Sequence, residues 1–178
     1  VSALPTTSIL PKAHVLNQRA MEILTDTGVA EEIYRRGTPP EHMRYSAYYV
    51  GLSGPDPIYG RSLGRMESWG GGGLDLDWAA ASPCRQTNLP QIRLEPILKA
   101  RAEALAPERV RFNTELVDLD QDADGVTAIV RDKSTDTETT VRARYLLACD
   151  GGRTVGRKLG VQMQGQRDVM RIVSVYMS

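Results

Sequence analysis

The sequence predicts an α/β fold, and three observations support this prediction. Two segments, positions 14–27 and 90–106, have apolar residues at the spacing of a helix with one buried face. Positions 110–144 hold short strand-like runs with a hairpin signal at Asp124-Gly125. The run Tyr145–Cys149 is apolar without alternation, which is typical of a strand covered on both faces in a parallel sheet.

The first part of the chain predicts two helices. Apolar residues recur at helical spacing over positions 14–27, and Gly28 follows as a stop. A second, short helix is expected over positions 30–36, because Gly37 and the prolines that follow it cannot continue a helix. We therefore expect a helical pair at the start of the chain.

A strand followed by an irregular region is expected next. Positions 44–51 are rich in Tyr and Val, which favours a strand. From Gly51 to Pro83 glycine and proline occur throughout, including four consecutive glycines at 70–73. This composition predicts a mobile loop or an irregular hairpin, in which the glycines permit close backbone approach.

The second part begins with the longer helix, over positions 90–106. Pro90 suits a first turn, and Gln91 follows Asn88 by three residues, as in a capping box. One face is apolar and consists of Leu94, Ile97, Leu98 and Leu105. Four strands follow, expected at 110–112, 116–119, 126–131 and 139–144. A buried parallel strand at 145–149 needs parallel neighbours that this order does not provide, so we expect an internal fragment of a larger protein.

Composition excludes several classes of function. The 178 residues include 22 Lys plus Arg and 22 Asp plus Glu, without the basic stripe that nucleic-acid binding needs. No apolar run reaches the roughly 18 residues of a membrane span, and no signal peptide is recognisable. Two cysteines, Cys84 and Cys149, cannot form a disulfide framework or a four-ligand zinc site. We expect a cytoplasmic protein that has no nucleic-acid or membrane partner, with Cys149 as a buried apolar filler.

Two motif matches fail in their context. Gly60–Gly64 matches the nucleophile elbow G-x-S-x-G, but no strand precedes it, no helix follows it, and both histidines come before Ser62. Asp120–Gly125 matches the first half of a calcium loop, but Arg131 stands where the closing Glu should be. We expect no serine catalysis and no metal site, and we interpret the acidic segment as a hairpin turn.

The most informative segment runs from Tyr145 to Gly160. Its pattern predicts a strand that ends at an acid, Asp150, followed by glycines and the start of a helix. Open α/β sheets place ligand-binding groups at this point. The Asp150 carboxylate can accept a hydrogen bond from a sugar hydroxyl, and Arg153 can meet a phosphate. The alternative is an ordinary strand-to-helix corner in which Asp150 caps the helix.

This segment resembles the second fingerprint of the group A flavoprotein aromatic hydroxylases, the para-hydroxybenzoate hydroxylase type. The fingerprint is D-G-A-R-S-x-V-R; here Asp150, Gly151, Arg153 and Arg157 stand, with mild departures at positions 152, 154 and 156. Two further segments are similar to the family in the right order, namely 11–22 and 88–95. The nearest resemblance is to the phenol and 2,4-dichlorophenol monooxygenases.

The resemblance implies a partial FAD-binding domain, Rossmann-like and of the glutathione-reductase type, with a three-stranded antiparallel meander and the edge of a substrate-domain sheet. The implied boundaries are 1–43 and 88–165 for the FAD-binding domain, 44–87 for an excursion into substrate-domain strands, and 166–178 for the start of the substrate domain. The sequence contains no G-x-G-x-x-G to hold the FAD pyrophosphate. We therefore expect the chain alone to bind FAD negligibly.

Residue roles are carried over by position. Lys12, with its neighbour Ala13, would face the pyrophosphate or ribose side of FAD. Gln91 would form a hydrogen bond with the cofactor from its helix. Asp150 and Arg153 would line a groove shared by FAD and NAD(P)H. His14 is a candidate for a residue near the substrate, and no catalytic base is identified.

The implied reaction is that of an aromatic-ring monooxygenase. NAD(P)H reduces FAD, oxygen adds to give a flavin hydroperoxide, and the distal oxygen is transferred to a phenolic small molecule. The sequence leaves a homo-oligomer open. It also leaves open two alternatives: a related flavoprotein, such as an epoxidase or halogenase, and a truncated module without activity.

Overall fold

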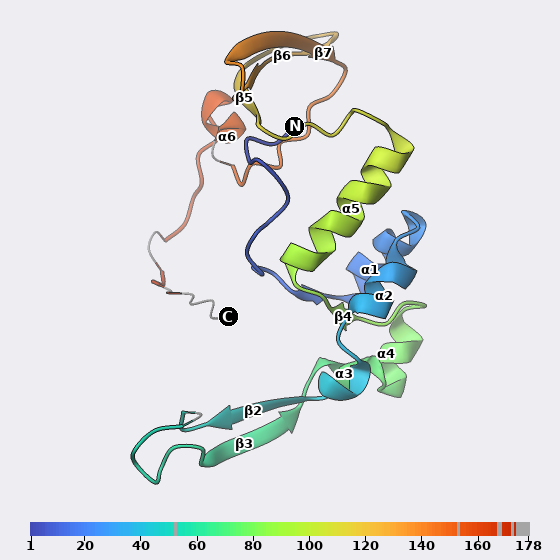
Figure 1. Ribbon diagram of the computed structural model, residues 1–178, viewed down its shortest axis with the longest axis vertical. Coiled ribbons are helices and arrows are strands. Elements are labelled where there is room, and N and C mark those ends of the chain that lie inside the picture. Colours follow the sequence, from blue (N-terminus) through green and yellow to red (C-terminus); the bar gives the residue numbers. More distant parts are fainter. Residues whose placement is uncertain (52, 153, 167–168, 172, 174–178) are drawn as a thin grey trace. The chain divides into compact units, whose positions relative to one another are not determined.

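The computed structural model describes residues 1–51, 53–152, 154–166, 169–171 and 173 (Figure 1). The chain forms two compact units. One unit is continuous and consists of residues Ser8–Leu105; the other combines Val1–Thr7 with Ala106–Ser178.

The continuous unit is built around three helices, α1 (Gln18–Asp26), α2 (Ala30–Arg36) and α5 (Gln91–Leu105). Their apolar faces form one core, and its most buried members are Met21, Ile33 and Leu89, each at most 1% exposed. Ile97 of α5 joins this core, and Leu94 and Leu98 pack against it, whereas Leu105 is 65% exposed. The three expected helices are therefore present, and the apolar face of α5 is shorter than its sequence suggested.

Helix α1 begins later than expected. Asn17 is its N-cap, with the side-chain oxygen accepting a hydrogen bond from the Ala20 N–H at 2.8 Å. The two residues before it, Val15–Leu16, form strand β1, which pairs antiparallel with β4 (Thr87–Asn88). Pairing with a distant segment thus keeps positions 14–17 out of the helix. Gly28 ends the turn after α1 with a positive φ of 77°, as its stop signal predicted.

The region from 44 to 83 is more ordered than a loop. Strand β2 (Tyr45–Tyr49) pairs antiparallel with β3 (Ser62–Glu67), which confirms the hairpin alternative. Short helical turns flank this hairpin: η1 (Pro40–His42), α3 (Trp69–Gly73) and α4 (Leu76–Ala81). The glycine-rich composition concealed α3, because Gly70, Gly71 and Gly72 take left-handed angles that only glycine adopts readily. Helix α4 was not predicted either.

Gly72 shows why the glycine run is needed. Its φ is +77°, and a Cβ at this position would lie 2.1 Å from the carbonyl oxygen of Pro40. No side chain fits between these two backbone segments. The glycines at this point permit close backbone approach, as the sequence predicted.

The other unit contains an antiparallel meander of three strands, β5 (Thr114–Asp122), β6 (Gly125–Asp132) and β7 (Thr137–Ala143) (Figure 1). The expected turn at Asp124-Gly125 joins β5 to β6, and the Asp122 carboxylate accepts from both of their N–H groups. Ala128 and Val130 of β6 are buried, so the predicted alternation is confirmed. Positions 110–112 are not a strand; the backbone instead turns at Asn113, whose φ is 51°.

The predicted buried strand at 145–149 is wrong for this chain. None of these residues is assigned to a strand, and Tyr145, Leu147 and Cys149 are exposed. A parallel strand needs a hydrogen-bonded neighbour, and the sheets formed by the described residues are antiparallel. Cys149 is therefore not a buried filler. Helix α6 (Val155–Lys158) follows the glycine turn, at the expected place.

Within the part of the chain that the structure describes, no helix is both long enough and apolar enough to cross a membrane.

Candidate functional site

Residues 11–14 are held against the start of α5. The backbone N–H of Gln91 donates to two carbonyl oxygens, those of Pro11 and Ala13, each at 2.9 Å. The Leu89 N–H donates to the His14 carbonyl at 2.8 Å, which extends the β1–β4 pairing. Between these anchors Lys12 has a positive φ of 43°, so the backbone makes a tight turn there. The turn leaves the side chains of Lys12 and Ala13 exposed.

The Gln91 side chain has a defined orientation. Its amide nitrogen donates to the Glu95 carboxylate, one turn further along α5. Because a carboxylate only accepts hydrogen bonds, the nitrogen must face Glu95, and the amide oxygen is the end left to accept from a ligand. The other Glu95 oxygen accepts from the backbone N–H of Ser8 at 2.5 Å. These contacts replace the expected capping box between Asn88 and Gln91.

His14 lies beside this turn and is exposed. Its ring nitrogen Nδ1 lies 3.0 Å from the side-chain oxygen of Asn88. Since that oxygen only accepts, Nδ1 carries the hydrogen and donates it, and Nε2 is left as an acceptor. The Asn88 side-chain oxygen thus forms a hydrogen bond with His14 and does not cap α5. The structure thus brings together four of the predicted residues, namely Lys12, Ala13, His14 and Gln91.

Asp150 belongs to the other unit and caps α6. Its carboxylate accepts from three backbone N–H groups, those of Gly152 at 2.9 Å, Thr154 at 2.6 Å and Val155 at 2.9 Å. These hydrogen bonds hold the pKa of the Asp150 carboxyl below its usual value, and those from Val155 and Thr154 have the largest effect. Asp150 is therefore an anion at neutral pH.

The glycines beside Asp150 leave space around it. Gly151 and Gly152 have positive φ values of 69° and 73°, and, beyond their chain neighbours, a Cβ at either would meet no atom of the described residues within 4 Å. The backbone at Gly151 and Gly152 therefore makes a turn and has free space beside it. Arg153, the remaining predicted residue, lies outside the described residues.

Glu95 is a functional candidate that the residue-by-residue interpretation missed. It lies in the segment that carries the resemblance, one turn after Gln91, and this spacing was the available signal. The contact with Ser8 could not be read from the sequence, because 87 positions separate the two residues. Tertiary structure alone reveals that Glu95 links Gln91 to the segment before the turn.

The rejected motifs have ordinary structural roles. Ser62 lies at the start of β3, where it pairs with Tyr49. In the acidic segment, Asp122 accepts from Arg142 at 2.6 Å as well as from the hairpin turn. No group of three or more potential metal-binding side chains gathers anywhere in the described ranges.

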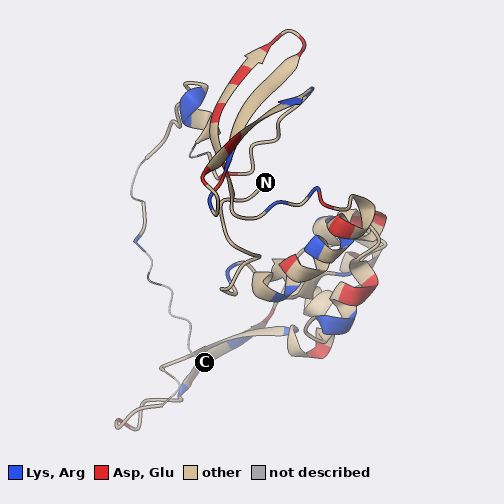
Figure 2. Cartoon of the chain, turned by 45° about the horizontal axis from the view of Figure 1, so that its top comes forward, with Lys and Arg blue, Asp and Glu red and all other residues tan. Residues whose placement is uncertain are grey.

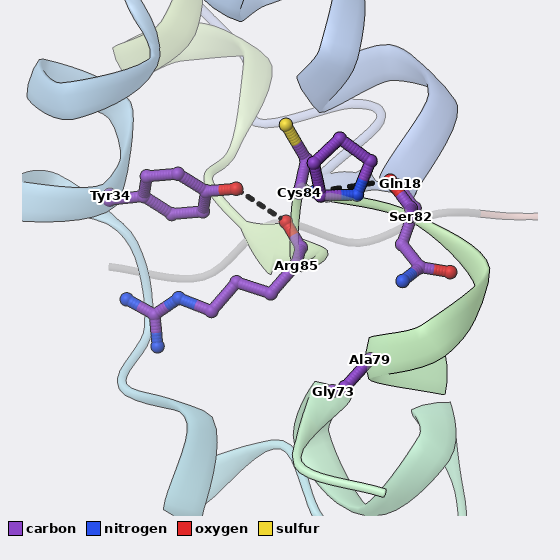
Figure 3. A pocket seen from close by; sticks show the side chains of 8 residues that line it. Gln18, Tyr34, Gly73, Ala79, Ser82, Cys84 and Arg85 are labelled. Carbon is purple, nitrogen blue, oxygen red and sulfur yellow. Dashed lines mark hydrogen bonds between the residues drawn. The ribbon is translucent and has the colours of Figure 1, made fainter. Parts of the chain in front are cut away.

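A pocket of about 320 Å³ lies in the continuous unit, apart from the residues predicted to contact the cofactor (Figure 3). Two of its polar side chains have hydrogen-bond partners within the chain. The Tyr34 hydroxyl donates to the Arg85 carbonyl at 2.6 Å, and the Gln18 amide donates to the Trp78 carbonyl at 2.7 Å. Burial raises the pKa of the Tyr34 hydroxyl above its usual value.

Comparison with known proteins identifies the family. The FAD binding domain family matches residues 1–178. The chain is 38% identical over 177 residues to 2,4-dichlorophenol 6-monooxygenase of Delftia acidovorans, covering 98% of this chain and 29% of that protein. It is 34% identical over 149 residues to phenol 2-monooxygenase of Pseudomonas sp. (strain EST1001), covering 83% of this chain and 23% of that protein.

Solved structures agree with this. A flavin-dependent monooxygenase, PieE, in complex with FAD and substrate, matches with a TM-score of 0.80 and 33% identity, over 92% of this chain and 28% of that one. The rebeccamycin biosynthetic enzyme RebC with reduced flavin matches with a TM-score of 0.72 and 27% identity, over 89% and 28%. The chain spans less than a third of the length of each of these relatives. The predicted resemblance is confirmed: the chain belongs to the FAD binding domain family.

Proposed function

We propose that this chain is part of a FAD-dependent monooxygenase that uses NAD(P)H and oxygen to hydroxylate a phenolic small molecule. The observation that carries the proposal is the family match over residues 1–178, together with relatives named as phenol and dichlorophenol monooxygenases. In this proposal the protein is cytoplasmic, and residues 1–43 and 88–165 belong to its FAD-binding domain. Residues 44–87 and 166–178 belong to its substrate domain, and a homo-oligomer stays open.

The chemistry of the predicted residues fits FAD. The cofactor carries a diphosphate, several hydroxyls and a ring with donors and acceptors. An exposed cation at Lys12 suits the diphosphate, and the acceptor oxygen of Gln91 suits a ring or hydroxyl donor. Asp150 is an anionic acceptor beside open backbone at Gly151, which suits a hydroxyl.

In the proposed site these groups bind FAD and orient it. Lys12 and Ala13, on the turn held by the Gln91 N–H, lie along the phosphate or ribose side of FAD. Gln91 fixes the position of the cofactor from α5. Asp150, with Arg153, lines the groove that the two cofactors share. Bound FAD supplies the redox chemistry, namely acceptance of hydride from NAD(P)H and activation of oxygen.

His14 is proposed to lie near the substrate. Its Nδ1 is committed to Asn88, so Nε2 is the atom that can accept a hydrogen bond or a proton from a phenolic hydroxyl. A phenolate is a better nucleophile than a phenol, so accepting this proton would favour hydroxylation. The role assigned to His14 is to hold that proton.

The test uses the intact protein that carries this chain, purified with its flavin. NAD(P)H oxidation is followed with and without a panel of phenols, and products are identified by mass spectrometry after incubation in ¹⁸O₂. The proposal expects NAD(P)H oxidation stimulated by a phenol and one ¹⁸O atom in the hydroxylated product. An epoxide or halogenated product, or a flavoprotein that no phenol stimulates, would overturn it.

A further inference from the structure

Helix α6 depends on the meander for its position. It has only four residues, Val155–Lys158, and so short a helix is not stable by itself. Val155, at its start, is buried with 6% exposure. At its end, the Lys158 ammonium pairs with the carboxylate of Asp118 on β5. Figure 2 shows the basic residues of α6 beside the acidic residues of the meander.

A β-bulge decides where Asp118 lies. Leu116 pairs with Val130 and Asp118 pairs with Ile129, so Val117 has no partner residue on β6. An extra residue reverses the alternation of side chains beyond it. Without the bulge, Asp118 would share the face of Leu116 and the buried Val130. With it, the Asp118 carboxylate lies on the opposite face, where Lys158 reaches it.

The Asp118 carboxylate has the properties of a fixed acceptor. It accepts from the Lys158 ammonium and from the Leu119 N–H, the latter at 2.8 Å. The hydrogen bond from Lys158 is the main cause that lowers the pKa of the Asp118 carboxyl. The pair is partly exposed, with side-chain exposures of 35% for Lys158 and 52% for Asp118. Exposed ion pairs contribute little to global stability, so we expect its effect to be local.

The other end of α6 is hydrogen-bonded to the proposed cofactor ligand, Asp150. The N–H groups of Thr154 and Val155, at the start of the helix, donate to Asp150. Any shift of α6 moves these donors relative to the Asp150 carboxylate. We propose that Asp118 and Lys158 are positioning residues, which hold α6 on the meander and thereby hold Asp150 for its contact with the cofactor. The cofactor part of this inference rests on the proposed function.

The first measurement is the pKa of Asp150, obtained by carboxyl ¹³C NMR in the 178-residue chain. In Asp118→Ala, loss of a nearby negative charge would by itself lower the pKa of Asp150. Loss of well-placed N–H donors would raise it toward its usual value. The two explanations therefore predict opposite signs. We expect the pKa to rise in Asp118→Ala and in Lys158→Met, and to stay as in the wild type in Lys158→Arg.

The second measurement is amide hydrogen exchange of Val155 at neutral pH, which does not require an acid titration. Exchange should become about two- to fivefold faster in Asp118→Ala, as expected when a partly exposed ion pair is lost. The amides of Ala128 and Val130 should be unchanged, which verifies that the sheet is folded. Arg142→Met is the matched control, because it removes an ion pair with Asp122 on the same sheet without touching α6.

The outcomes separate this inference from the proposed function. An unchanged or lowered pKa of Asp150 in Asp118→Ala, with unchanged Val155 exchange, would overturn the positioning role. So would an equal effect of Arg142→Met. FAD retention is measured in the intact flavoprotein. A looser Asp150 with unaltered FAD retention would support the Asp118–Lys158 tether and overturn the cofactor role of Asp150.

Discussion

Gln91 and Glu95 lie one turn apart on α5, and the side-chain amide of Gln91 donates a hydrogen bond to the Glu95 carboxylate. Glu95 in turn accepts from Ser8, which precedes the Lys12 turn. The orientation of Gln91 is therefore set by a residue that belongs to its own helix and is anchored to another segment. This arrangement leaves the Gln91 amide oxygen available to the cofactor.

The first prediction concerns this oxygen. Gln91→Ala in the intact flavoprotein should weaken FAD retention by roughly tenfold or less, since a neutral hydrogen bond contributes about 0.5–1.5 kcal/mol. Glu95→Ala should act in the same direction, because it frees the amide to rotate. Glu103→Ala, which removes a carboxylate paired with Lys99 on the same helix, is the control. Equilibrium titration of the apoprotein with FAD measures the effect, and equal affinities for Gln91→Ala and wild type would contradict the assignment.

The second prediction concerns Asp150. Asp150→Ala removes the acceptor of three N–H groups and a proposed cofactor contact, so it should slow NAD(P)H-driven flavin reduction more than hydroxylation by the reduced enzyme. Rapid-mixing kinetics resolve the two half-reactions. Asp150→Asn keeps an oxygen that can accept hydrogen bonds from the start of α6 but loses the negative charge. It therefore separates the capping of α6 from the effect of the charge on the cofactor. Normal flavin reduction with failed oxygen transfer in Asp150→Ala would show that the role is wrong.

The third prediction is a pH dependence centred on Glu32. Hydrogen bonds from Arg35, then Arg36, lower the pKa of the Glu32 carboxyl to about 2, against 4.5 for the unperturbed group. Because the folded pKa is the lower one, its stabilising contribution is complete above pH 4.5 and is lost as the pH falls toward 2. The stability difference between wild type and Glu32→Gln should shrink over that window. Glu31→Gln removes a charge from the same turn of α2 without these ion pairs; a similar pH profile for both variants would refute the assignment.

The fourth prediction tests the helical core. Ile33 is 0% exposed, and Ile33→Ala should cost about 2–5 kcal/mol of unfolding free energy, because it leaves a cavity between α1, α2 and α5. Ile23→Ala is the matched control. Ile23 is 51% exposed, and its loss should change stability by no more than about 0.5 kcal/mol. Urea unfolding measures both, and similar losses for the two variants would mean that the core is misassigned.

The fifth prediction concerns FAD and the chain alone. The sequence holds no G-x-G-x-x-G, the loop that places a pyrophosphate on a helix N-terminus, so its 178 residues should bind FAD only weakly. Fluorescence titration should give a dissociation constant above about 1 μM, which corresponds to roughly −8 kcal/mol. Tighter binding would require another phosphate site among these residues.

Local features of the fold were predictable from neighbouring residues. Helix α2 has the expected bounds, Ala30–Arg36, and α5 differs from its prediction by one residue at each end. The meander and its turn at Asp124-Gly125 follow from alternation and turn chemistry. Asp150 caps α6, which was the structural alternative recognised from the sequence. In each case the hydrogen bonds that define the feature join residues close together in the chain.

Features that depend on distant partners were decided by the tertiary structure. The β1–β4 pairing shortens α1, and the Ser8 contact orients Glu95 and through it Gln91. The apolar run 145–149 has the composition of a buried parallel strand, yet without a parallel neighbour it is exposed. The sequence by itself determined helices α2 and α5, the meander and the family. Only the tertiary structure decided how the candidate residues are held, because a hydrogen bond across 70 or more positions depends on where the fold places its partner.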